Sequence, residues 1–302
     1  MFPDGFEARR IDTDGAEIHC VHGGVGPPLL LLHGYPQNHV MWHRVAPLLS
    51  GQFHLVCPDL RGYGDSSKPD GGCDHAAYSK RAMARDMVEL MASLGHQHFA
   101  VAGHDRGARV THRMMLDHPA RISRGCVMDI APTLHMFETT DQAFATGYYH
   151  WFFLIQPDGL PERMIGADPE YYLQQKLSRW SAPGARFDPA AVDDYLRCFR
   201  HPDTIYASCE DYRAAAGIDL EHDREDRGRR LAQPLLVLWG KHGFVHRTYD
   251  VAGVWRRYAS DVDAVALDAG HFLPEEAPAA VASEMSRFFS APCGDQAPPG
   301  GP

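Results

Sequence analysis

Asp105 lies at the centre of the strongest chemical pattern in the sequence. The five residues from 103 to 107 read Gly-His-Asp-Arg-Gly and stand between an apolar run and a segment with helical periodicity. This spacing is typical of a sharp turn from strand to helix that exposes a nucleophile, because small residues at both ends permit the tight backbone. A carboxylate at its centre can attack a saturated carbon, expel a leaving group and form an alkyl ester, whereas a serine would indicate acyl transfer. The alternative is an aspartate that only caps the following helix, which is common for isolated aspartates.

Hydrolysis of such an ester requires a base that activates water. His271 follows the last predicted strand, late in the chain, where enzymes with this turn carry their catalytic histidine. A neutral imidazole can accept a proton from water near physiological pH. Most of the nineteen histidines should be structural, but the position of His271 predicts that it is the base.

The acidic partner of His271 is harder to find. Many enzymes of this kind place it in the turn after the strand at 235–239, yet residues 239–244 read Trp-Gly-Lys-His-Gly-Phe and contain no carboxylate. Asp129 ends the strand that follows the nucleophile helix, so we expect it to orient His271 and stabilise its charge. Asp250 is a weaker candidate, for which helix capping or solvation is the expected role.

Two backbone amides are expected to stabilise the oxyanion of the second step. Residues 33–36, His-Gly-Tyr-Pro, follow the first buried strand, and this turn can offer the N–H of Tyr35. The N–H of Arg106, directly after the nucleophile, would supply the second donor. His33 itself is expected to be structural.

Arg106 and Arg109 indicate an anionic substrate. Three positions apart at the start of the nucleophile helix, they would lie on one face beside Asp105, where the helix dipole adds positive potential. Two guanidiniums can bind a carboxylate and hold its α-carbon in line with the attacking oxygen. They would also keep Asp105 ionised, since nearby positive charge lowers the pKa of a carboxyl. For either arginine alone, a surface salt bridge is the ordinary explanation.

The elements that position these residues are predicted to alternate as in a doubly wound, mostly parallel α/β sheet. Short apolar runs bounded by Gly, Pro or Asp predict buried parallel strands at 29–33, 54–59, 99–104, 125–129, 235–239 and 264–267. Helical patterns occupy residues 78–94, 108–117, 248–258 and 278–289.

Residues 134–230 are expected to form a helical cap inserted into this sheet. The segment is rich in aromatic and charged residues and has no convincing buried-strand run. It divides the core into residues 1–133 and 231–294, and the tail at 295–302 is expected to be flexible. The aromatic side chains of the cap would suit a lid over a small-molecule pocket, although packing within the cap is the expected role of most of them.

Composition limits the partners and the compartment. With 44% hydrophobic and 23% charged residues, the chain is typical of a globular protein. The formal charge of -10 argues against a general nucleic-acid or anionic-membrane surface, so an anionic substrate needs a local positive pocket. No segment approaches the ~20 apolar residues of a membrane span, and we expect a cytoplasmic protein. Seven cysteines without CxxC pairs predict reduced thiols, no disulfide framework and no metal, and no organic cofactor is expected.

The chain resembles the haloacetate dehalogenases of the α/β-hydrolase superfamily, a family that includes the fluoroacetate dehalogenases. The resemblance runs through nearly the whole chain, whereas motifs shared only with epoxide hydrolases would stop short of the cap. The motifs that carry it are His33-Gly34-Tyr35-Pro36-Gln37, Val40-Met41-Trp42-His43, Asp59-Leu60-Arg61-Gly62-Tyr63-Gly64-Asp65, Gly103-His104-Asp105-Arg106-Gly107-Ala108-Arg109, Met128-Asp129-Ile130-Ala131-Pro132, Tyr149-His150-Trp151, Gln156-Pro157, Cys209-Glu210-Asp211-Tyr212-Arg213 and Gly270-His271-Phe272-Leu273-Pro274-Glu275-Glu276.

The resemblance implies the roles given above for the nucleophile, the base, the acid and the two arginines. It also implies that His150, Trp151 and Tyr212 donate hydrogen bonds to the departing halide. Fluoride in particular is a poor leaving group with concentrated charge, so imidazole, indole and phenol donors would stabilise it. Without the resemblance, His150 and Trp151 would look like packing residues of the cap. The resemblance is also compatible with a homodimer.

The predicted reaction is hydrolytic dehalogenation of a haloacetate or another short 2-haloacid, with water as the second substrate. Asp105 displaces the halide, and water activated by His271 hydrolyses the ester to a 2-hydroxyacid. An epoxide hydrolase is the first alternative, because it shares the aspartate and the late histidine, but a neutral epoxide gives Arg106 and Arg109 little purpose. A ligand-binding member of the fold without catalysis is the second alternative, and the complete set of nucleophile, base and acid argues against it.

Overall fold

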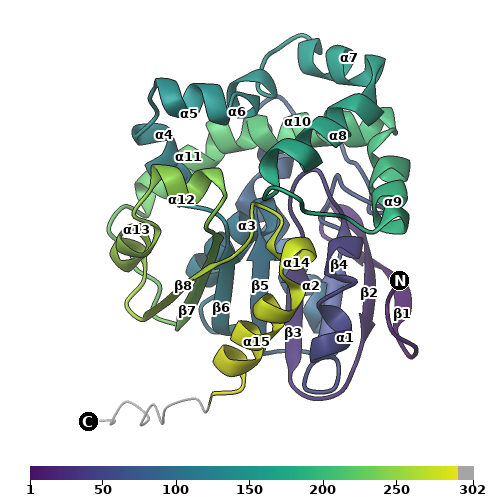
Figure 1. The fold of residues 1–302 in the computed structure, drawn as a ribbon, viewed down its shortest axis with the longest axis vertical. Coiled ribbons are helices and arrows are strands. Elements are labelled where there is room, and N and C mark those ends of the chain that lie inside the picture. The colour runs from purple at the N-terminus through teal and green to yellow at the C-terminus, as the bar shows by residue number, and fades with distance from the viewer. Residues whose placement is uncertain (292–302) are drawn as a thin grey trace.

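An eight-stranded sheet forms the centre of the molecule (Figure 1). In the computed structural model of the protein, residues 1–291 are described, and the tail expected to be flexible at 295–302 lies outside them. The strand order is β1-β2-β4-β3-β5-β6-β7-β8. The strands are β1 (Glu7–Thr13), β2 (Ala16–Gly23), β3 (Pro28–Leu32), β4 (His54–Pro58), β5 (Phe99–His104), β6 (Ile122–Met128), β7 (Leu235–Gly240) and β8 (Val262–Leu267).

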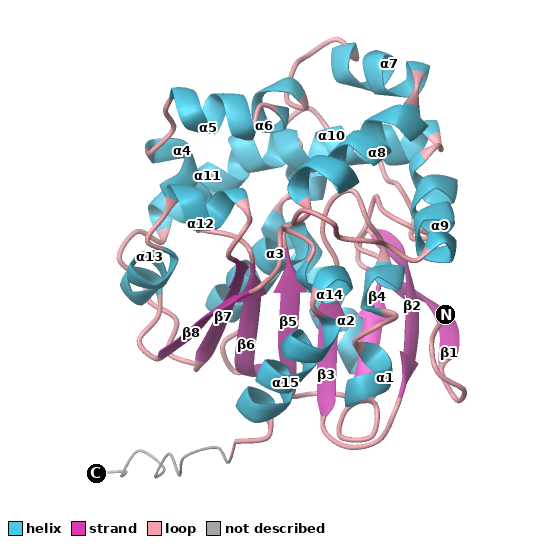
Figure 2. Ribbon diagram, viewed as in Figure 1, coloured by secondary structure: helices cyan, strands magenta, loops and turns pink. Residues whose placement is uncertain are grey.

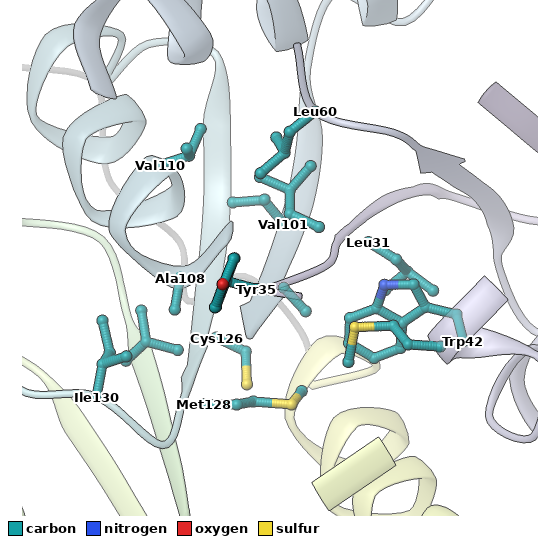
Figure 3. Packing of buried hydrophobic residues seen from close by; sticks show 14 of the residues in the cluster. Leu31, Tyr35, Trp42, Leu60, Val101, Ala108, Val110, Cys126, Met128 and Ile130 are labelled. Atoms are coloured by element: carbon teal, nitrogen blue, oxygen red, sulfur yellow. The ribbon is translucent and has the colours of Figure 1, made fainter. Parts of the chain in front are cut away.

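The six strands from β3 to β8 pair in parallel, which confirms the predicted fold class. Parallel strands are covered by helices on both faces and therefore consist of nearly continuous apolar runs. Leu29 to Leu32 in β3 and Leu235 to Leu238 in β7 are almost completely buried. Figure 3 shows Val101, Cys126 and Met128 of β5 and β6 within this core.

Two antiparallel strands precede this parallel part, and the sequence prediction missed both. β1 pairs with β2, and β2 pairs with β4, in antiparallel fashion. β1 is mostly exposed, and β2 contains both buried and partly buried residues. Neither strand contains a continuous apolar run, which was the signal on which the strand prediction depended.

Helices cover both faces of the sheet (Figure 2). The long helices α2 (Lys80–Ser93) and α3 (Arg106–Asp117) lie on one face, and α1 (Ala46–Leu49) and α15 (Pro278–Phe289) lie on the other. The four predicted core helices correspond to α2, α3, α13 and α15 to within three residues at each end. The remaining core elements are η1 (His39–Trp42), η2 (Ala76–Tyr78), α12 (Phe244–Thr248), α13 (Val251–Tyr258) and α14 (Leu273–Glu276).

The helices between β6 and β7 form a layer over the carboxyl ends of the parallel strands (Figure 1). They are α4 (Thr133–Glu138), α5 (Gln142–Gly147), α6 (His150–Phe153), α7 (Leu160–Ala167), α8 (Pro169–Trp180), α9 (Pro189–Phe199), α10 (Pro202–Ala216) and α11 (Ile218–Glu225). Residues that follow β3, β5, β6 and β8 therefore lie between the sheet and this helical layer. Within residues 1–291, no helix is both long and apolar enough to cross a membrane.

Candidate active site

Asp105 occupies the tight turn between β5 and α3. Its backbone has φ 48° and ψ −111°, a region that residues with a side chain rarely adopt. A Cβ on Gly103 would lie 2.3 Å from the Gly107 carbonyl oxygen, and a Cβ on Gly107 would lie 2.4 Å from the His33 carbonyl oxygen. The close approach of backbone at this turn thus requires glycine at both places, which gives the sequence pattern its physical reason.

The Asp105 carboxylate does not cap α3. It forms no capping hydrogen bond with that helix, and its Oδ1 instead accepts the Tyr35 backbone N–H at 2.9 Å. Tyr35 thus donates to the carboxylate that would become the ester. The N–H of Arg106, the second predicted oxyanion donor, forms no hydrogen bond with Asp105 within the described part of the chain.

His271 and Asp129 come together beside Asp105. His271 lies in the loop between β8 and α14, and its Nδ1 is 2.7 Å from Asp129 Oδ2. The other oxygen of Asp129 accepts the Gly240 N–H at 3.1 Å, which holds the carboxylate in place. His271 Nε2 lies 3.9 Å from Asp105 Oδ2 and is buried without a hydrogen-bond partner among residues 1–291. Asp250, the weaker candidate for the acid, instead caps α13.

The surrounding charges set the ionisation of this pair. Burial alone would raise the pKa of Asp105, but His271, His104 and the two arginines outweigh it, and that pKa is lowered. Burial would likewise disfavour a charged His271, yet the hydrogen bond and the charge of Asp129 outweigh it and raise the pKa of His271. Asp105 is therefore ionised near neutral pH. An Nδ1–H donated to Asp129 leaves His271 Nε2 as the proton acceptor.

Arg106 is held by an acidic residue that the sequence analysis did not assign to the site. Its Nε and Nη2 lie 2.8 and 2.7 Å from the two carboxylate oxygens of Asp211 on α10. Lys80 and the Tyr63 hydroxyl also contact that carboxylate. Arg106 is 1% exposed, and its Nη1 has no hydrogen-bond partner in the described part of the chain. One edge of the guanidinium is thus fixed by the cap and the other remains available.

Arg109 is a buried cation whose partners are all neutral. Nη1 donates to the Ala131 carbonyl oxygen at 3.1 Å and to Thr133 Oγ1 at 2.9 Å, and Nη2 lies 3.2 Å from Met136 Sδ. Its Nε has no hydrogen-bond partner, and no carboxylate pairs with it in residues 1–291. Burial, followed by the charge of Arg106, lowers the pKa of Arg109. An anion bound here would compensate that charge.

The three residues implied to bind halide meet above this arginine pair. His150 and Trp151 lie on α6, and Tyr212 lies on α10. All three are 2% exposed, and the Tyr212 ring centroid is 5.6 Å from that of His150 and 6.4 Å from that of Trp151. Cation-π contacts place the Arg106 guanidinium 4.2 Å from the Tyr212 ring and the Arg109 guanidinium 4.7 Å from the Trp151 ring.

His150 is a neutral imidazole in this environment. Burial, followed by the charge of Lys176, holds the pKa of His150 well below its ordinary value. Its Nδ1 is buried, and no described residue forms a hydrogen bond with it. A neutral imidazole carries one ring N–H donor, so His150 can donate a hydrogen bond without bringing a further charge.

Sequence reasoning missed several residues that shape the site. Asp211 adjoins Tyr212 in a motif that carried the family resemblance, so its place in the chain was a usable signal. Trp180 offered no such signal, yet its ring centroid is 4.7 Å from that of His150 and 5.3 Å from that of His271. Tyr148 is buried, and its ring centroid lies 5.1 Å from that of His150.

A second group of ligand-type side chains lies outside the nucleophile site. His19, His39 and Asp59 present ligand atoms within 4.8 Å of one another. The Asp59 oxygens accept hydrogen bonds from both Nδ1 atoms, at 3.0 Å for His19 and 2.8 Å for His39. They also accept the backbone N–H groups of His39 and Asp65, both at 2.8 Å. These four bonds explain the group as a buried hydrogen-bond network.

The chain is similar over almost its whole length to proteins of the alpha/beta hydrolase fold. The family model for the alpha/beta hydrolase fold matches residues 27–278. A fluoroacetate dehalogenase of Burkholderia sp is 47% identical over 288 residues, which cover 95% of each chain. A soluble epoxide hydrolase of Corynebacterium sp. (strain C12) is 33% identical over 285 residues, which cover 92% of this chain and 95% of that protein. The crystal structure of a candidate alpha/beta hydrolase from Nostoc sp PCC 7120 matches with a TM-score of 0.94 and 55% identity, over 95% of this chain and 99% of that one.

Proposed function

Because the chain belongs to the haloacetate dehalogenase family of the alpha/beta hydrolase fold, we propose that it hydrolyses the carbon–halogen bond of a haloacetate or another short 2-haloacid. The observation that carries this proposal is a set of buried polar atoms without hydrogen-bond partners on the residues grouped around Asp105. Four of these atoms are Arg106 Nη1, Arg109 Nε, His150 Nδ1 and His271 Nε2. Buried polar atoms are normally paired, and a haloacid with its hydrolytic water offers each of these atoms a partner of suitable chemistry.

The first step is a displacement at carbon. Arg106 and Arg109 bind the substrate carboxylate and hold the α-carbon in line with an oxygen of Asp105. The carboxylate oxygen forms a bond to that carbon while the electron pair of the carbon–halogen bond leaves with the halide. His150, Trp151 and Tyr212 donate hydrogen bonds to the departing halide, so they stabilise charge that appears only as the bond breaks.

The second step regenerates the enzyme. His271 Nε2 takes a proton from water, and the resulting hydroxide adds to the carbonyl carbon of the Asp105 ester. The Tyr35 N–H stabilises the oxyanion, and the imidazolium is stabilised by Asp129. When the tetrahedral intermediate collapses, the bond between its central carbon and the ester oxygen breaks, and the electron pair leaves with that oxygen as an alkoxide. The alkoxide takes the proton from His271 and leaves as the 2-hydroxyacid. Asp105 is released as a carboxylate, so the net products are hydroxyacid, halide and one proton.

Halide release from purified protein tests this proposal. Fluoroacetate, chloroacetate and a neutral aryl epoxide are supplied separately, and halide and diol are measured with the Asp105→Ala variant as the control. We expect halide from at least one haloacetate and none from the variant. With one enantiomer of 2-chloropropionate, a single displacement at carbon gives inverted configuration, and retention would contradict the mechanism.

Epoxide hydrolysis is the second candidate, because an epoxide hydrolase is 33% identical to this chain and because cap tyrosines border the nucleophile. Burial raises the pKa of both Tyr148 and Tyr212, and the charge of Asp105 raises both further, after that of Asp129 in the case of Tyr148, which indicates that both phenols lie near Asp105. A phenol could protonate an epoxide oxygen. Diol formation without halide release would favour this candidate, while ligand binding without any turnover would favour a non-catalytic member of the fold.

We also propose the division of the chain into core and cap, a cytoplasmic location and a homodimer. Residues 134–230 would act as a cap on a core made of 1–133 and 231–294, and limited proteolysis would test these boundaries. A homodimer would be seen by light scattering of the purified protein. Cell fractionation would test the expected cytoplasmic location.

A further inference from the structure

A cavity of about 710 Å³ opens beside the nucleophile site. It lies between α8 of the cap, the segment before α6 and the loop that follows β7, and His271 and Trp180 are among the residues that line it. His271 is the proposed base, so the cavity leads to the reacting groups. We call this cavity the vestibule.

The vestibule is positively charged although the protein is acidic. Lys176, Arg179, Lys241 and Arg247 line it, and its described lining contains neither aspartate nor glutamate. Arg179 donates to the Gln175 side chain, and Arg247 donates to a backbone carbonyl oxygen. None of the four cations forms a salt bridge within residues 1–291. In a chain with 29 basic and 39 acidic residues, such a gathering of unpaired cations is a local feature and does not reflect the overall charge.

Lys176 has the most unusual environment of the four. Lys176 is 3% exposed, and its Nζ donates a hydrogen bond to the Tyr149 hydroxyl at 3.1 Å. The same atom lies 4.2 Å from the Tyr149 ring centroid and 4.9 Å from those of Tyr172 and Trp180. Aromatic faces attract an ammonium group, more strongly where water is excluded. The three rings therefore hold the Lys176 side chain in a cage that supplies no negative counter-charge. Burial, followed by the charge of Arg179, lowers the pKa of Lys176 to about 7, so a bound anion would favour its protonated form.

Electrostatics connects this cage to the nucleophile site. Lys176 is the first charged group among those that lower the pKa of His150, so the ammonium lies within reach of the halide-binding residues. Trp180 forms one wall of the cage and also contacts His150 and His271. An anion at Lys176 would be separated from the reacting groups by little more than the Trp180 ring.

We propose that the vestibule selects anionic substrates and that Lys176 binds the carboxylate of the incoming haloacid before it passes Trp180 to reach Arg109. This inference rests on the proposed function and adds a specificity-determining residue to it. Arg179, Lys241 and Arg247 raise the local concentration of the anion at the mouth of the cavity, because clefts lined by one sign of charge focus the field. The carboxylate supplies the counter-charge that the cage lacks, and moves on because Arg109 offers it a second unpaired cation.

The central variant is Lys176→Met, which keeps the length of the side chain and removes its charge. The expected result is a fall of about tenfold or more in kcat/KM for chloroacetate, with kcat within twofold of wild type, and a weaker dependence of kcat/KM on salt. Lys176→Arg restores a cation and should recover most of the loss. Arg287→Gln is the matched charge control, since Arg287 is an exposed arginine on α15 that lies far from α8 (Figure 1), and it should leave kcat/KM unchanged.

Stability separates a binding role from a structural one. A buried ammonium without a counter-ion is not expected to stabilise the fold, so the melting temperature of Lys176→Met should equal or exceed that of wild type. A lower melting temperature with unchanged salt dependence would overturn the proposal and leave Lys176 as a packing residue. A fall in kcat with unchanged kcat/KM would also overturn it, because that pattern points to halide release and not to substrate capture.

A binding measurement keeps this inference distinct from the reaction mechanism. In Asp105→Ala protein, which cannot form the ester, chloroacetate and neutral chloroacetamide are titrated while tryptophan fluorescence is recorded. Adding Lys176→Met should weaken chloroacetate binding and leave chloroacetamide binding unchanged. Equal effects on both ligands would refute the inference even if dehalogenation is confirmed. Selective weakening would support it even if no haloacid is turned over.

Discussion

Arg106 and Asp211 form a two-point ion pair that joins the nucleophile helix to the cap. Nε lies 2.8 Å from Oδ2, Nη2 lies 2.7 Å from Oδ1, and neither residue is more than 1% exposed. The pair leaves Arg106 Nη1 without a partner. It therefore gives one arginine of the proposed carboxylate clamp a fixed direction, while the other, Arg109, forms no salt bridge within residues 1–291 and bonds only to neutral groups.

Asp211→Asn is expected to damage both stability and substrate binding. Removing one partner of a buried ion pair leaves Arg106 without its counter-charge and Lys80 with Asp219 alone, at 3.5 Å, which costs about 3–5 kcal/mol of unfolding free energy. KM for chloroacetate should rise because Arg106 loses its orientation. Urea unfolding and steady-state kinetics measure the two effects. Asp263→Asn removes an exposed partner of Arg287 and should cost less than about 1 kcal/mol, so equal losses in the two variants would contradict this prediction.

Arg109→Gln is expected to reduce the stabilisation of the transition state for haloacids selectively. The lost interaction is a hydrogen bond from a cation to a carboxylate, worth about 1.5–3 kcal/mol, and kcat/KM should fall about 10- to 100-fold. Arg109→Lys should recover only part of this, because an ammonium cannot reproduce the planar fork of a guanidinium. Comparable rates of halide release by Arg109→Gln and wild type would remove Arg109 from the substrate site.

The pH dependence should report His271. His271 must be neutral to accept a proton, and its pKa is raised from 6.5. Where ester hydrolysis limits turnover, kcat should therefore reach its plateau at high pH and fall as the pH drops through a value above 6.5. In Asp129→Asn the charge that raises this pKa is gone and burial lowers it, so the acid limb should move to lower pH while the plateau rate falls. A limb that stays in place in Asp129→Asn would show that Asp129 does not act on His271.

The tight turn at Asp105 could be predicted from the sequence because its geometry constrains the residues that form it. The turn at Asp105 requires glycine at 103 and 107 over a span of five residues, and such a local requirement is visible in the chain. The buried strands were visible for a similar reason, since parallel strands covered on both faces need continuous apolar runs. β1 and β2 have no such runs and were missed.

Contacts between distant segments could not be predicted in this way. Arg106 and Asp211 are 105 positions apart, and nothing in the residues around either one specifies the other. Lys176 lies in the segment expected to form the cap, and its surroundings combine Tyr172 and Trp180 of its own helix with Tyr149 from the segment before α6. The place of Asp129 after a strand was enough to suggest that it pairs with His271, and the structure adds the distance of 2.7 Å and the oxygen that makes the contact.

Gly107→Ala should disrupt the tight turn at Asp105. A Cβ at this position would lie 2.4 Å from the His33 carbonyl oxygen, so the backbone must shift, and we expect a loss of about 1–3 kcal/mol in unfolding free energy together with a large fall in kcat. Gly166→Ala in α7 is the control, because a Cβ there meets no atom within 4 Å and should stabilise by about 0.4–1 kcal/mol. Thermal unfolding and halide release compare the two variants.

The central claim is that Asp105 becomes an ester during turnover, and trapping that ester tests it most directly. In His271→Asn the second step lacks its base, so chloroacetate should release one halide per active site and leave one carboxymethyl group on the protein. Peptide mass spectrometry should place that group on Asp105. A full halide burst without any covalent adduct, or an adduct on another residue, would contradict the mechanism.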